Sequence, residues 1–569
     1  MLFVQFSYGQ VSDSDSYFDT LEEKLEPILQ LQLDEVADST EREAVCMVAS
    51  IIGVRQFVQH RYQDAIRTLE FAIKYSKRQD NTVKMQNYTF LIHSLCLTHN
   101  RDALIKLQEL MQIFQDLQEN TVRGDFPMEY ADVMRMGMND ILLPLTSLIS
   151  HTFPDNETLG YCFNLMMYLK QFSFYQLGNR FGTDIRHQLY QDYRTLISAK
   201  LQKDEVCIEF VPYMVIEEQK IKETNYVAYV LDSSGNLNFV EVCNKNEMEA
   251  LYEYNDSSWL LYDKQSSQLS TIVWKKLEPY VTKKKRIYLA PCGILNRVNF
   301  LLFDSRIYEL TSTRELLKSY IVNPHSDAVI IGDVNYNQSD TSQIRGEQDW
   351  GKLKGTKLEV DSIANILSPY YNITKLTQDN CSEAAIKQIC MTSPKILHFA
   401  THAFCYTDSV RREQNDFFNF PYDYFPEKLE MTYTGIVLSE GNIGFKRSGN
   451  RSLNNDGILL SDEIYKLSLD GTALVVLSAC NSANGIFDDI EGTVGLLRAF
   501  KLAGVKTVIA SLFQIDDNAA CEFMSEFYRR MVEEEDMHSS FVGAIKTMKA
   551  KYPDNPKFWA MFKLIDYKE

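Results

Sequence analysis

The amino-acid sequence predicts a mixed α/β protein, in which a mostly parallel sheet flanked by helices follows an all-helical N-terminal part. Apolar residues recur at helical spacing through the first 200 residues, which contain few glycines or prolines. Beyond them, short apolar runs such as VCIEFV are typical of buried strands. Two of these runs, residues 396–403 (ILHFATHA) and 473–485 (ALVVLSACNSANG), end on residues capable of covalent chemistry.

Residues 1–203 are predicted to form a helical interaction or regulatory domain. Part of this region fits a tetratricopeptide-like repeat of about 34 residues, and a poorer copy is centred on Ala103. The small and aromatic positions of the better copy are Gly53, Tyr62, Ala65 and Ala72. A general array of helical hairpins fits equally well. Either architecture presents a concave surface to a protein partner.

The strand-rich part is predicted to divide into residues 204–330 and residues 331–569. The second of these contains an insert, residues 404–456, that is longer than a return between neighbouring strands requires. Its first half is aromatic and acidic, and its second half is rich in Gly, Asn, Ser and Arg. This composition predicts a packed excursion followed by a flexible loop.

His402 and Cys480 end the two apolar runs. A cysteine near its ordinary pKa is mostly protonated at pH 7, so a cysteine nucleophile needs an adjacent imidazole or another positive environment. Because parallel strands present functional groups at their carboxyl ends, the two residues are candidates for a catalytic dyad. Alternatively, Cys480 is a small core residue. His398, which lies inside its strand, is predicted to be structural.

Nine segments, in order over about the last 345 residues, resemble the CHAT domain, a branch of the caspase and separase clan of cysteine peptidases. They are NYVAYV (225–230), IYLAPCGILNRVNFLLF (287–303), GDVNY (332–336), ILHFATHA, GILLSDEI (457–464), LVVLSAC, EGTVGLLRAFKLA (491–503), VIASLFQIDDNA (508–519) and PKFWAMFKL (556–564). The resemblance implies a caspase-like fold for this region.

The resemblance also implies that His402 is the general base and Cys480 the nucleophile of a peptide-bond hydrolase. The backbone N–H groups of Ala403 and Cys480 would then form the oxyanion hole. Ala403 replaces the family's usual glycine, which incurs a steric cost if the position requires a positive φ. Residues 481–485 (NSANG) replace the usual xTGxG, and Phe513 replaces a tryptophan.

Asp516 and Asp517 follow the segment VIASLF. Separase-like enzymes place an acid in this region to receive a basic P1 side chain, and a carboxylate there would pair with Arg or Lys. Alternatively, Asp-Asp-Asn is a good N-cap for the helix that follows. The two roles can coexist.

The insert contains basic residues at which such an enzyme could process itself. They are Arg411, Arg412, Lys446 and Arg447. Self-processing requires basic P1 specificity. The alternative is a surface loop with incidental basic residues.

A net charge of −19 argues against a nucleic-acid-binding surface and suits attraction of basic protein partners. The eleven cysteines show no metal-binding spacing, and their scatter fits a reducing cytoplasm. No apolar run is long enough to span a membrane. The chemistry requires no metal or other cofactor.

The sequence therefore predicts a cytoplasmic cysteine endopeptidase that cleaves a protein substrate. CHAT proteins fused to helical repeats resemble partner-activated proteases of bacterial defence, so an activating protein is expected to bind the helical domain. One alternative is a catalytically silent scaffold that binds protein partners. A second is a hydrolase of small acyl compounds that uses the same dyad.

Overall fold

The computed structural model describes residues 15–30, 39–76, 81–122, 141–170, 191–217, 220–253, 258–262, 268–320, 323–337, 350–405, 434–443, 455–480, 482–483, 485–488, 492–534 and 536–566. The chain forms two compact units. One comprises residues 1–169 and 213–224, and the other comprises residues 170–212 and 225–569.

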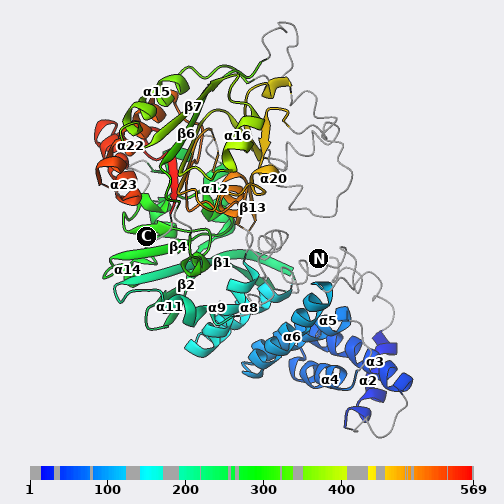
Figure 1. Ribbon diagram of the computed structural model, residues 1–569. Helices are drawn as coiled ribbons and strands as arrows, with labels where there is room; N and C mark the ends of the chain where they lie inside the picture. The colour runs from blue at the N-terminus through cyan, green and yellow to red at the C-terminus, as the bar shows by residue number, and fades with distance from the viewer. Residues whose placement is uncertain are drawn as a thin grey trace. The chain divides into compact units, whose positions relative to one another are not determined.

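The first unit is helical apart from the strand ends in residues 213–224 (Figure 1). Its helices are α2 (Asp15–Leu25), the 3-10 helix η1 (Ile28–Gln30), α3 (Ser39–Val58), α4 (Tyr62–Tyr75), α5 (Asn81–Leu97), α6 (Asp102–Val122), α8 (Leu143–Thr152) and α9 (Asn156–Leu169). Short connections make α3 and α4 neighbours, and likewise α5 and α6. The unit therefore contains helical hairpins.

The hairpin of α3 and α4 packs closely at Gly53. A Cβ atom on this glycine would lie 2.6 Å from Cγ of Leu69. Ala65 and Ala72, which face the same hairpin, are fully buried. The absence of a side chain at Gly53 thus allows α3 to approach α4. Assignment of the hairpins to tetratricopeptide repeats stays a prediction.

The second unit contains two main sheets. The first sheet has the strand order β3-β2-β1-β4-β5. Strands β1, β4 and β5 run parallel, whereas β2 and β3 pair antiparallel. The strands are β1 (Glu205–Glu217), β2 (Lys220–Asp232), β3 (Leu237–Asn244), β4 (Arg286–Ala290) and β5 (Ile307–Glu309). Around them lie α11 (Tyr193–Ser198), η4 (Ser258–Tyr262), α12 (Lys245–Glu253), α13 (Gln268–Val273), α14 (Glu278–Val281), η5 (Gly293–Arg297), η6 (Phe300–Leu302) and η7 (Thr313–Leu317).

The second sheet has the order β16-β15-β12-β8-β6-β7, and all its strands except β16 run parallel. They are β6 (Asp327–Val334), β7 (Asn372–Gln378), β8 (Ile396–Ala400), β12 (Leu474–Ser478), β15 (Thr507–Ser511) and β16 (Phe562–Ile565). Every residue of β8, β12 and β15 is buried. Burial on both faces explains why these strands are continuous apolar runs in the sequence.

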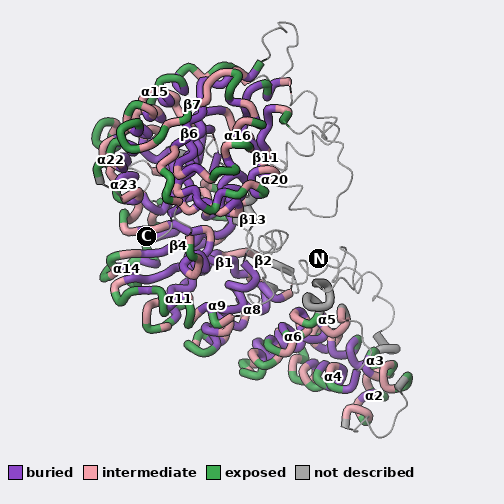
Figure 2. Tube along the Cα trace, viewed as in Figure 1, coloured by how far each residue is buried: buried purple, intermediate pink, exposed green. Residues whose placement is uncertain are grey.

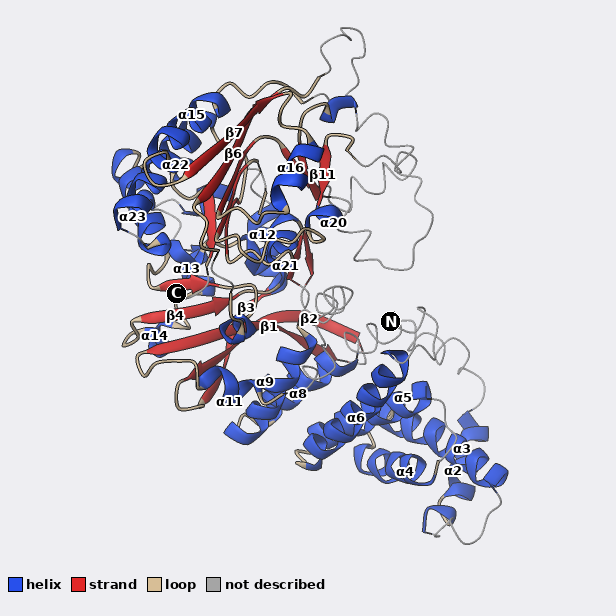
Figure 3. Ribbon diagram, viewed as in Figure 1, coloured by secondary structure: helices blue, strands red, loops and turns tan. Residues whose placement is uncertain are grey.

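Helices cover both faces of this sheet (Figure 3). One layer contains α15 (Thr356–Leu367), α22 (Asp517–Glu534) and α23 (Met537–Lys551), and the other contains α16 (Glu383–Cys390) and α20 (Ser461–Ile464). The unit also contains α21 (Leu496–Leu502) and η8 (Pro556–Phe558). The exposed residues lie on the outer sides of these helices (Figure 2). The predicted α/β class, with helices flanking a mostly parallel sheet, is confirmed.

The described part of the predicted insert is not only loop. It contributes to β9 (Ala403–Cys405) and forms β10 (Thr434–Val437), and these two strands pair antiparallel. On its other side, β10 pairs antiparallel with β11 (Ile458–Leu460). A short hairpin of β13 (Ile486–Asp488) and β14 (Gly492–Val494) follows the cysteine run. The insert thus contributes a strand to a three-stranded sheet beside the end of β8.

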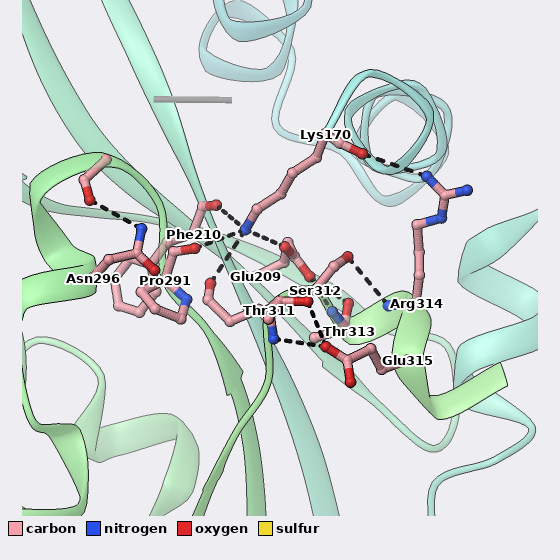
Figure 4. Close-up of polar contacts among 12 residues, drawn as sticks. Lys170, Glu209, Phe210, Pro291, Asn296, Thr311, Ser312, Thr313, Arg314 and Glu315 are labelled. Carbon is pink, nitrogen blue, oxygen red and sulfur yellow. Dashed lines mark hydrogen bonds and ion pairs between the residues drawn. The ribbon is translucent and has the colours of Figure 1, made fainter. Parts of the chain in front are cut away.

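A buried ion pair fixes the residue that follows α9 (Figure 4). The Lys170 amino group contacts a carboxylate oxygen of Glu209, and it also donates to the carbonyl oxygens of Phe210 and Pro291 at 3.2 and 3.0 Å. The other Glu209 oxygen accepts from the backbone N–H of Thr313 at 2.7 Å. Removing one member would leave the other charge buried and unpaired, at a cost of about 3–5 kcal/mol. These contacts therefore hold the Lys170 side chain against β1.

Candidate active site

His402 and Cys480 lie at the same edge of the second sheet. Strands β8 and β12 are parallel neighbours, and their register pairs Ala400 with Ser478. His402 is two residues beyond Ala400, and Cys480 is two residues beyond Ser478. Equal distances from a paired position bring both residues to adjacent strand ends, although they are 78 residues apart in the sequence (480 − 402).

The two histidines of β8 have different surroundings. His398 is fully buried, with Nε2 3.1 Å from Oε1 of Glu359 and Nδ1 3.2 Å from the Tyr528 hydroxyl. These partners lie on α15 and α22, so His398 joins the sheet to its helical layer. His402, just past the strand end, is partly exposed. Only the second histidine is placed to meet a substrate.

The His402 imidazole is oriented by a backbone carbonyl. Its Nε2 lies 2.8 Å from the carbonyl oxygen of Gly351. A carbonyl only accepts hydrogen bonds, so Nε2 carries the proton and the neutral ring keeps Nδ1 as its acceptor. Burial lowers the pKa of His402, while the Gly351 contact and the charge of Asp517 oppose this shift. His402 thus has the tautomer of a base that works through Nδ1.

Tyr336 and Thr401 fix the backbone at His402. The Tyr336 hydroxyl lies 2.9 Å from Oγ1 of Thr401, which donates to the carbonyl oxygen of Val437 at 2.7 Å. The Val437 N–H donates to the His402 carbonyl at 2.9 Å. The Tyr336 ring, whose centroid lies 5.0 Å from that of the imidazole, packs against it. Contacts from Tyr336, just beyond β6, and from β10 therefore hold the histidine.

The Cys480 thiol is partly buried, and its surroundings favour the protonated form. Burial raises its pKa, and the charge of Asp517 raises it further. The N–H of Ile515 and the charge of Lys557 oppose these effects. Both Cys480 and His402 are described, and no hydrogen bond joins their side chains. The raised pKa of the thiol and the lowered pKa of the imidazole therefore both favour the neutral forms.

Buried hydroxyls brace the turn after Cys480. Ser482 donates through Oγ to the Leu477 carbonyl at 3.0 Å and accepts from the Ser511 N–H at 2.9 Å. Ser511 donates through Oγ to the Ala479 carbonyl. The N–H of Ala483, the residue in place of the family's first glycine, donates to the Ser511 carbonyl at 2.8 Å. The end of β15 thus fixes the backbone on both sides of Cys480.

Ala403 does not require the conformation of a glycine. It is the first residue of β9, in extended backbone, and it pairs with Ile436. Hydrogen-bonded and non-hydrogen-bonded pairs alternate along an antiparallel ladder, and the neighbouring pair His402–Val437 is bonded. The Ala403 N–H therefore points away from β10. The steric cost expected if this position had a positive φ does not arise.

The adjacent acids Asp516 and Asp517 have different contacts. Oδ1 of Asp516 accepts from the N–H groups of Asn518 and Ala519 at 3.1 and 3.0 Å, which caps α22. Asp517 instead accepts through Oδ2 from the Gly355 N–H at 3.2 Å. A Cβ on Gly355 would lie 2.4 Å from Cβ of Asp517, so only glycine fits there. Asp517 is the acid whose charge acts on both His402 and Cys480.

Several residues at the site were not identified from the sequence. The segment 350–355, here called the strap, supplies Gly351 to His402 and Gly355 to Asp517. Asn442, in the insert, holds the strap at Trp350. These contacts use backbone groups or the side-chain amide of Asn442, which lies in the helical residues 441–443, and no periodicity or motif in the sequence marks them. The Asn442 position could be found only from the fold.

The four residues proposed for self-processing, Arg411, Arg412, Lys446 and Arg447, lie outside the described residues. Within the ranges that are described, no group of three or more His, Cys, Asp or Glu side chains could hold a metal ion. None of the described helices combines the length and the apolarity that crossing a bilayer requires.

A mostly parallel sheet that presents a histidine and a cysteine at neighbouring strand ends places the protein in the class of caspase-like folds. The CHAT domain family matches residues 263–567, which is more than half of the sequence, and the chain belongs to this family. No curated protein matches the chain.

The solved structures that are similar to this chain include a separase complex and a gingipain. A crystal structure of the Saccharomyces cerevisiae separase–securin complex is 10% identical, with a TM-score of 0.43, and the match covers 99% of this chain and 49% of that chain. This chain thus spans about half the length of the separase chain. The Arg-specific cysteine proteinase gingipain R (RGPB) is 12% identical with a TM-score of 0.30, covering 56% of this chain and 68% of that chain.

Proposed function

We propose that the protein is a cysteine endopeptidase in which His402 is the general base and Cys480 is the nucleophile. The observation that carries this proposal is the register of β8 and β12, which brings the two residues to the same sheet edge. The Gly351 contact supports it further, because it leaves Nδ1 of His402 as a proton acceptor.

In the proposed cycle, Nδ1 of His402 takes the thiol proton and Sγ of Cys480 attacks the scissile carbonyl carbon. The N–H groups of Ala403 and Cys480 donate to the oxyanion that forms. When the C–N bond breaks, the imidazolium gives its proton to the leaving amine. His402 then deprotonates a water molecule, which hydrolyses the thioester and releases the acid and the thiol.

We further propose that a protein partner switches the enzyme on. Burial disfavours the charged form of both dyad residues, so the described arrangement does not favour the thiolate–imidazolium pair. A small movement that brings the imidazole to the thiol would activate the nucleophile. We propose that the activator binds the helical unit and that the protein acts in bacterial defence.

The proposed location of the protein is a reducing cytoplasm. All eleven cysteines are free, which suits this location.

The proposed substrate is a protein with a basic P1 residue, and Asp517 is the proposed partner of that residue. Asp516 is committed to the cap of α22, whereas Asp517 is partly exposed and acts on the dyad. A carboxylate accepts several hydrogen bonds, so the Gly355 contact leaves acceptor capacity for Arg or Lys. Cleavage at Arg411, Arg412, Lys446 or Arg447 would follow from the same preference.

The test is a fluorogenic peptide mixture with Arg, Lys, Met, Leu and Asp at P1, with and without host lysate. Wild type is compared with Cys480→Ala and His402→Ala. Cleavage that both substitutions reduce by at least about 10³-fold supports the dyad. Cleavage only with lysate supports a partner-gated enzyme.

The scaffold alternative has one observation in its favour, namely that no hydrogen bond joins the described His402 and Cys480 side chains. It predicts no cleavage under any condition and unchanged partner binding in the Cys480→Ala variant. Cleavage that persists in both dyad variants would contradict the assigned roles.

A further inference from the structure

Asn442 forms four hydrogen bonds although it lies in a connection after β10. Its side-chain Oδ1 accepts from the Trp350 N–H at 2.8 Å, and its Nδ2 donates to the Trp350 carbonyl at 3.1 Å. The same Nδ2 donates to Oδ1 of Asn337 at 2.9 Å, and its backbone N–H donates to the Tyr336 carbonyl at 3.1 Å. The amide thus binds both polar backbone groups of one strap residue.

The burial and chemistry of this site require an asparagine. Asn442 is 2% exposed, so each polar atom of its side chain needs a partner within the protein. Trp350 presents one donor and one acceptor, and an amide is the side-chain group that complements both. These partners also fix which amide atom is the oxygen.

The strap is short, and its other end is fixed as well. One residue after Trp350, the Gly351 carbonyl contacts Nε2 of His402 at 2.8 Å. Lys352 pairs with Asp333 at 3.1 Å, and the Gly355 N–H donates to Asp517 at 3.2 Å. The Lys352 side chain is 64% exposed, so its ion pair is weak. The Asn442 bonds to Trp350 are therefore a buried support of the strap one residue from Gly351, beside the contact of the Trp350 ring with Phe404, whose centroids lie 6.0 Å apart.

We propose that Asn442 is a positioning residue of the dyad, which acts through the strap to hold the Gly351 carbonyl against His402. This inference rests on the proposed peptidase function and extends it to a residue of the insert. Asn442 lies in the same short segment as β10, whose Val437 N–H binds the His402 carbonyl. Residues 434–443 of the insert thus support His402 both at its imidazole ring and at its backbone carbonyl.

The test uses the full-length chain with two substitutions. Asn442→Ala removes every side-chain bond to Trp350. Asn442→Asp is nearly isosteric and keeps an acceptor for the Trp350 N–H, but an ionised carboxylate has no donor for the Trp350 carbonyl. We expect each to reduce kcat by about 10–100-fold and to change KM by less than about 3-fold, because substrate contacts are unaffected.

The matched control is Asn299→Ala. Asn299 is also a buried amide, 1% exposed, and its Nδ2 donates to the Phe562 carbonyl at 2.8 Å. A comparable loss of stability in both alanine variants, with loss of kcat only at Asn442, would support positioning. Equal loss of kcat in both variants would overturn the positioning role of Asn442, because the loss of kcat would then result from reduced stability.

A second measurement does not depend on peptide cleavage. Iodoacetamide modification of Cys480 at pH 7 is followed by peptide mass spectrometry, with Cys521 on α22 as the internal reference. If His402→Ala slows modification of Cys480, Asn442→Ala should slow it by a similar factor, at least about 5-fold. An unchanged rate in Asn442→Ala overturns the inference. An absence of cleavage in wild type, together with slowed modification in Asn442→Ala, overturns only the peptidase function.

Discussion

At the scale of single residues, one charge raises the pKa of both members of the proposed dyad. Asp517 favours the protonated form of His402 and also the protonated form of Cys480. In the proposed cycle, it would therefore stabilise the imidazolium while disfavouring the thiolate that must form with it. A basic P1 side chain that neutralises Asp517 would reduce this second effect. In the proposed mechanism, substrate binding and thiol activation would thus be linked at one carboxylate.

The adjacent acids allow a matched pair of substitutions. Asp517→Asn removes the charge that faces the dyad, and we expect a loss of at least about 10-fold in kcat/KM for peptides with Arg or Lys at P1. Peptides with Leu or Met at P1 should change by less than about 3-fold. Asp516→Asn removes an equal charge one residue away and keeps the helix cap, because Asn is as good an N-cap. It should leave the P1 preference unchanged.

Measurement of kcat/KM over the five P1 residues checks this prediction. Unchanged selectivity in Asp517→Asn, with a folded protein, would remove Asp517 from the specificity pocket. A change of selectivity in Asp516→Asn instead would transfer that role to its neighbour.

At the scale of elements, β15 supports the turn that carries Cys480, the proposed nucleophile. The Ser511 hydroxyl, at the end of this strand, donates to the Ala479 carbonyl and accepts from the Ser482 N–H at 3.2 Å. Both partners are buried, so an alanine at 511 would leave them without this support. The cost of an unsatisfied buried polar group is about 1–3 kcal/mol.

We therefore expect Ser511→Ala to reduce the free energy of unfolding by about 1–3 kcal/mol, as measured by urea denaturation. Ser540→Ala is the control, since the Ser540 hydroxyl is equally buried and donates to the Asp536 carbonyl at 2.6 Å within one helix. Its expected cost is about 0.5–1.5 kcal/mol. Equal costs at the two positions would show that the Ser511 contacts add nothing beyond an ordinary hydrogen bond.

The sequence predicted the positions of two buried strands of the second sheet. The runs that contain LHFA and LVVLS coincide with β8 and β12, since burial on both faces leaves no polar positions to interrupt the signal. The insert was interpreted as an excursion and a loop, whereas its described part contributes β10. A four-residue strand has too few positions for a periodic pattern.

At the scale of the whole molecule, β16 connects the two sheets of the second unit. Lys563 pairs with Glu309 of β5 at 2.5 Å, and the Asp566 N–H donates to the Glu309 carbonyl at 3.0 Å. Oδ1 of Asp566 accepts from the Thr507 hydroxyl of β15 at 2.7 Å. Burial raises the pKa of Asp566 to about 6, against the opposing Thr507 hydrogen bond. Protonation of one carboxyl is therefore linked to folding of this unit.

The sign of the pH effect follows from this raised pKa. An aspartate in the unfolded chain has a pKa near 3.9, so the folded protein binds the proton more tightly. The stabilising contribution is full below about pH 4 and is lost as the pH rises through about 6. We expect it to amount to about 1–3 kcal/mol.

Urea denaturation at pH 4, 5, 6 and 7 measures this effect. Asp566→Asn keeps an acceptor for Thr507 but does not titrate, so its free energy of unfolding should fall less between pH 4 and 7 than that of wild type. Parallel curves for the two proteins would assign the pH dependence to other groups.

The sequence by itself determined the α/β class, the family resemblance, and the two reactive residues at the ends of apolar runs. It could do so because buried strands and their terminal motifs are encoded by contiguous residues. The tertiary structure alone decided what surrounds the dyad. Gly351 is 51 residues from His402, Asn442 is 92 from Trp350, and Gly355 is 162 from Asp517. Each of these contacts joins a side chain to a backbone group. Every residue has such backbone groups, so only folding selects which of them the side chain meets.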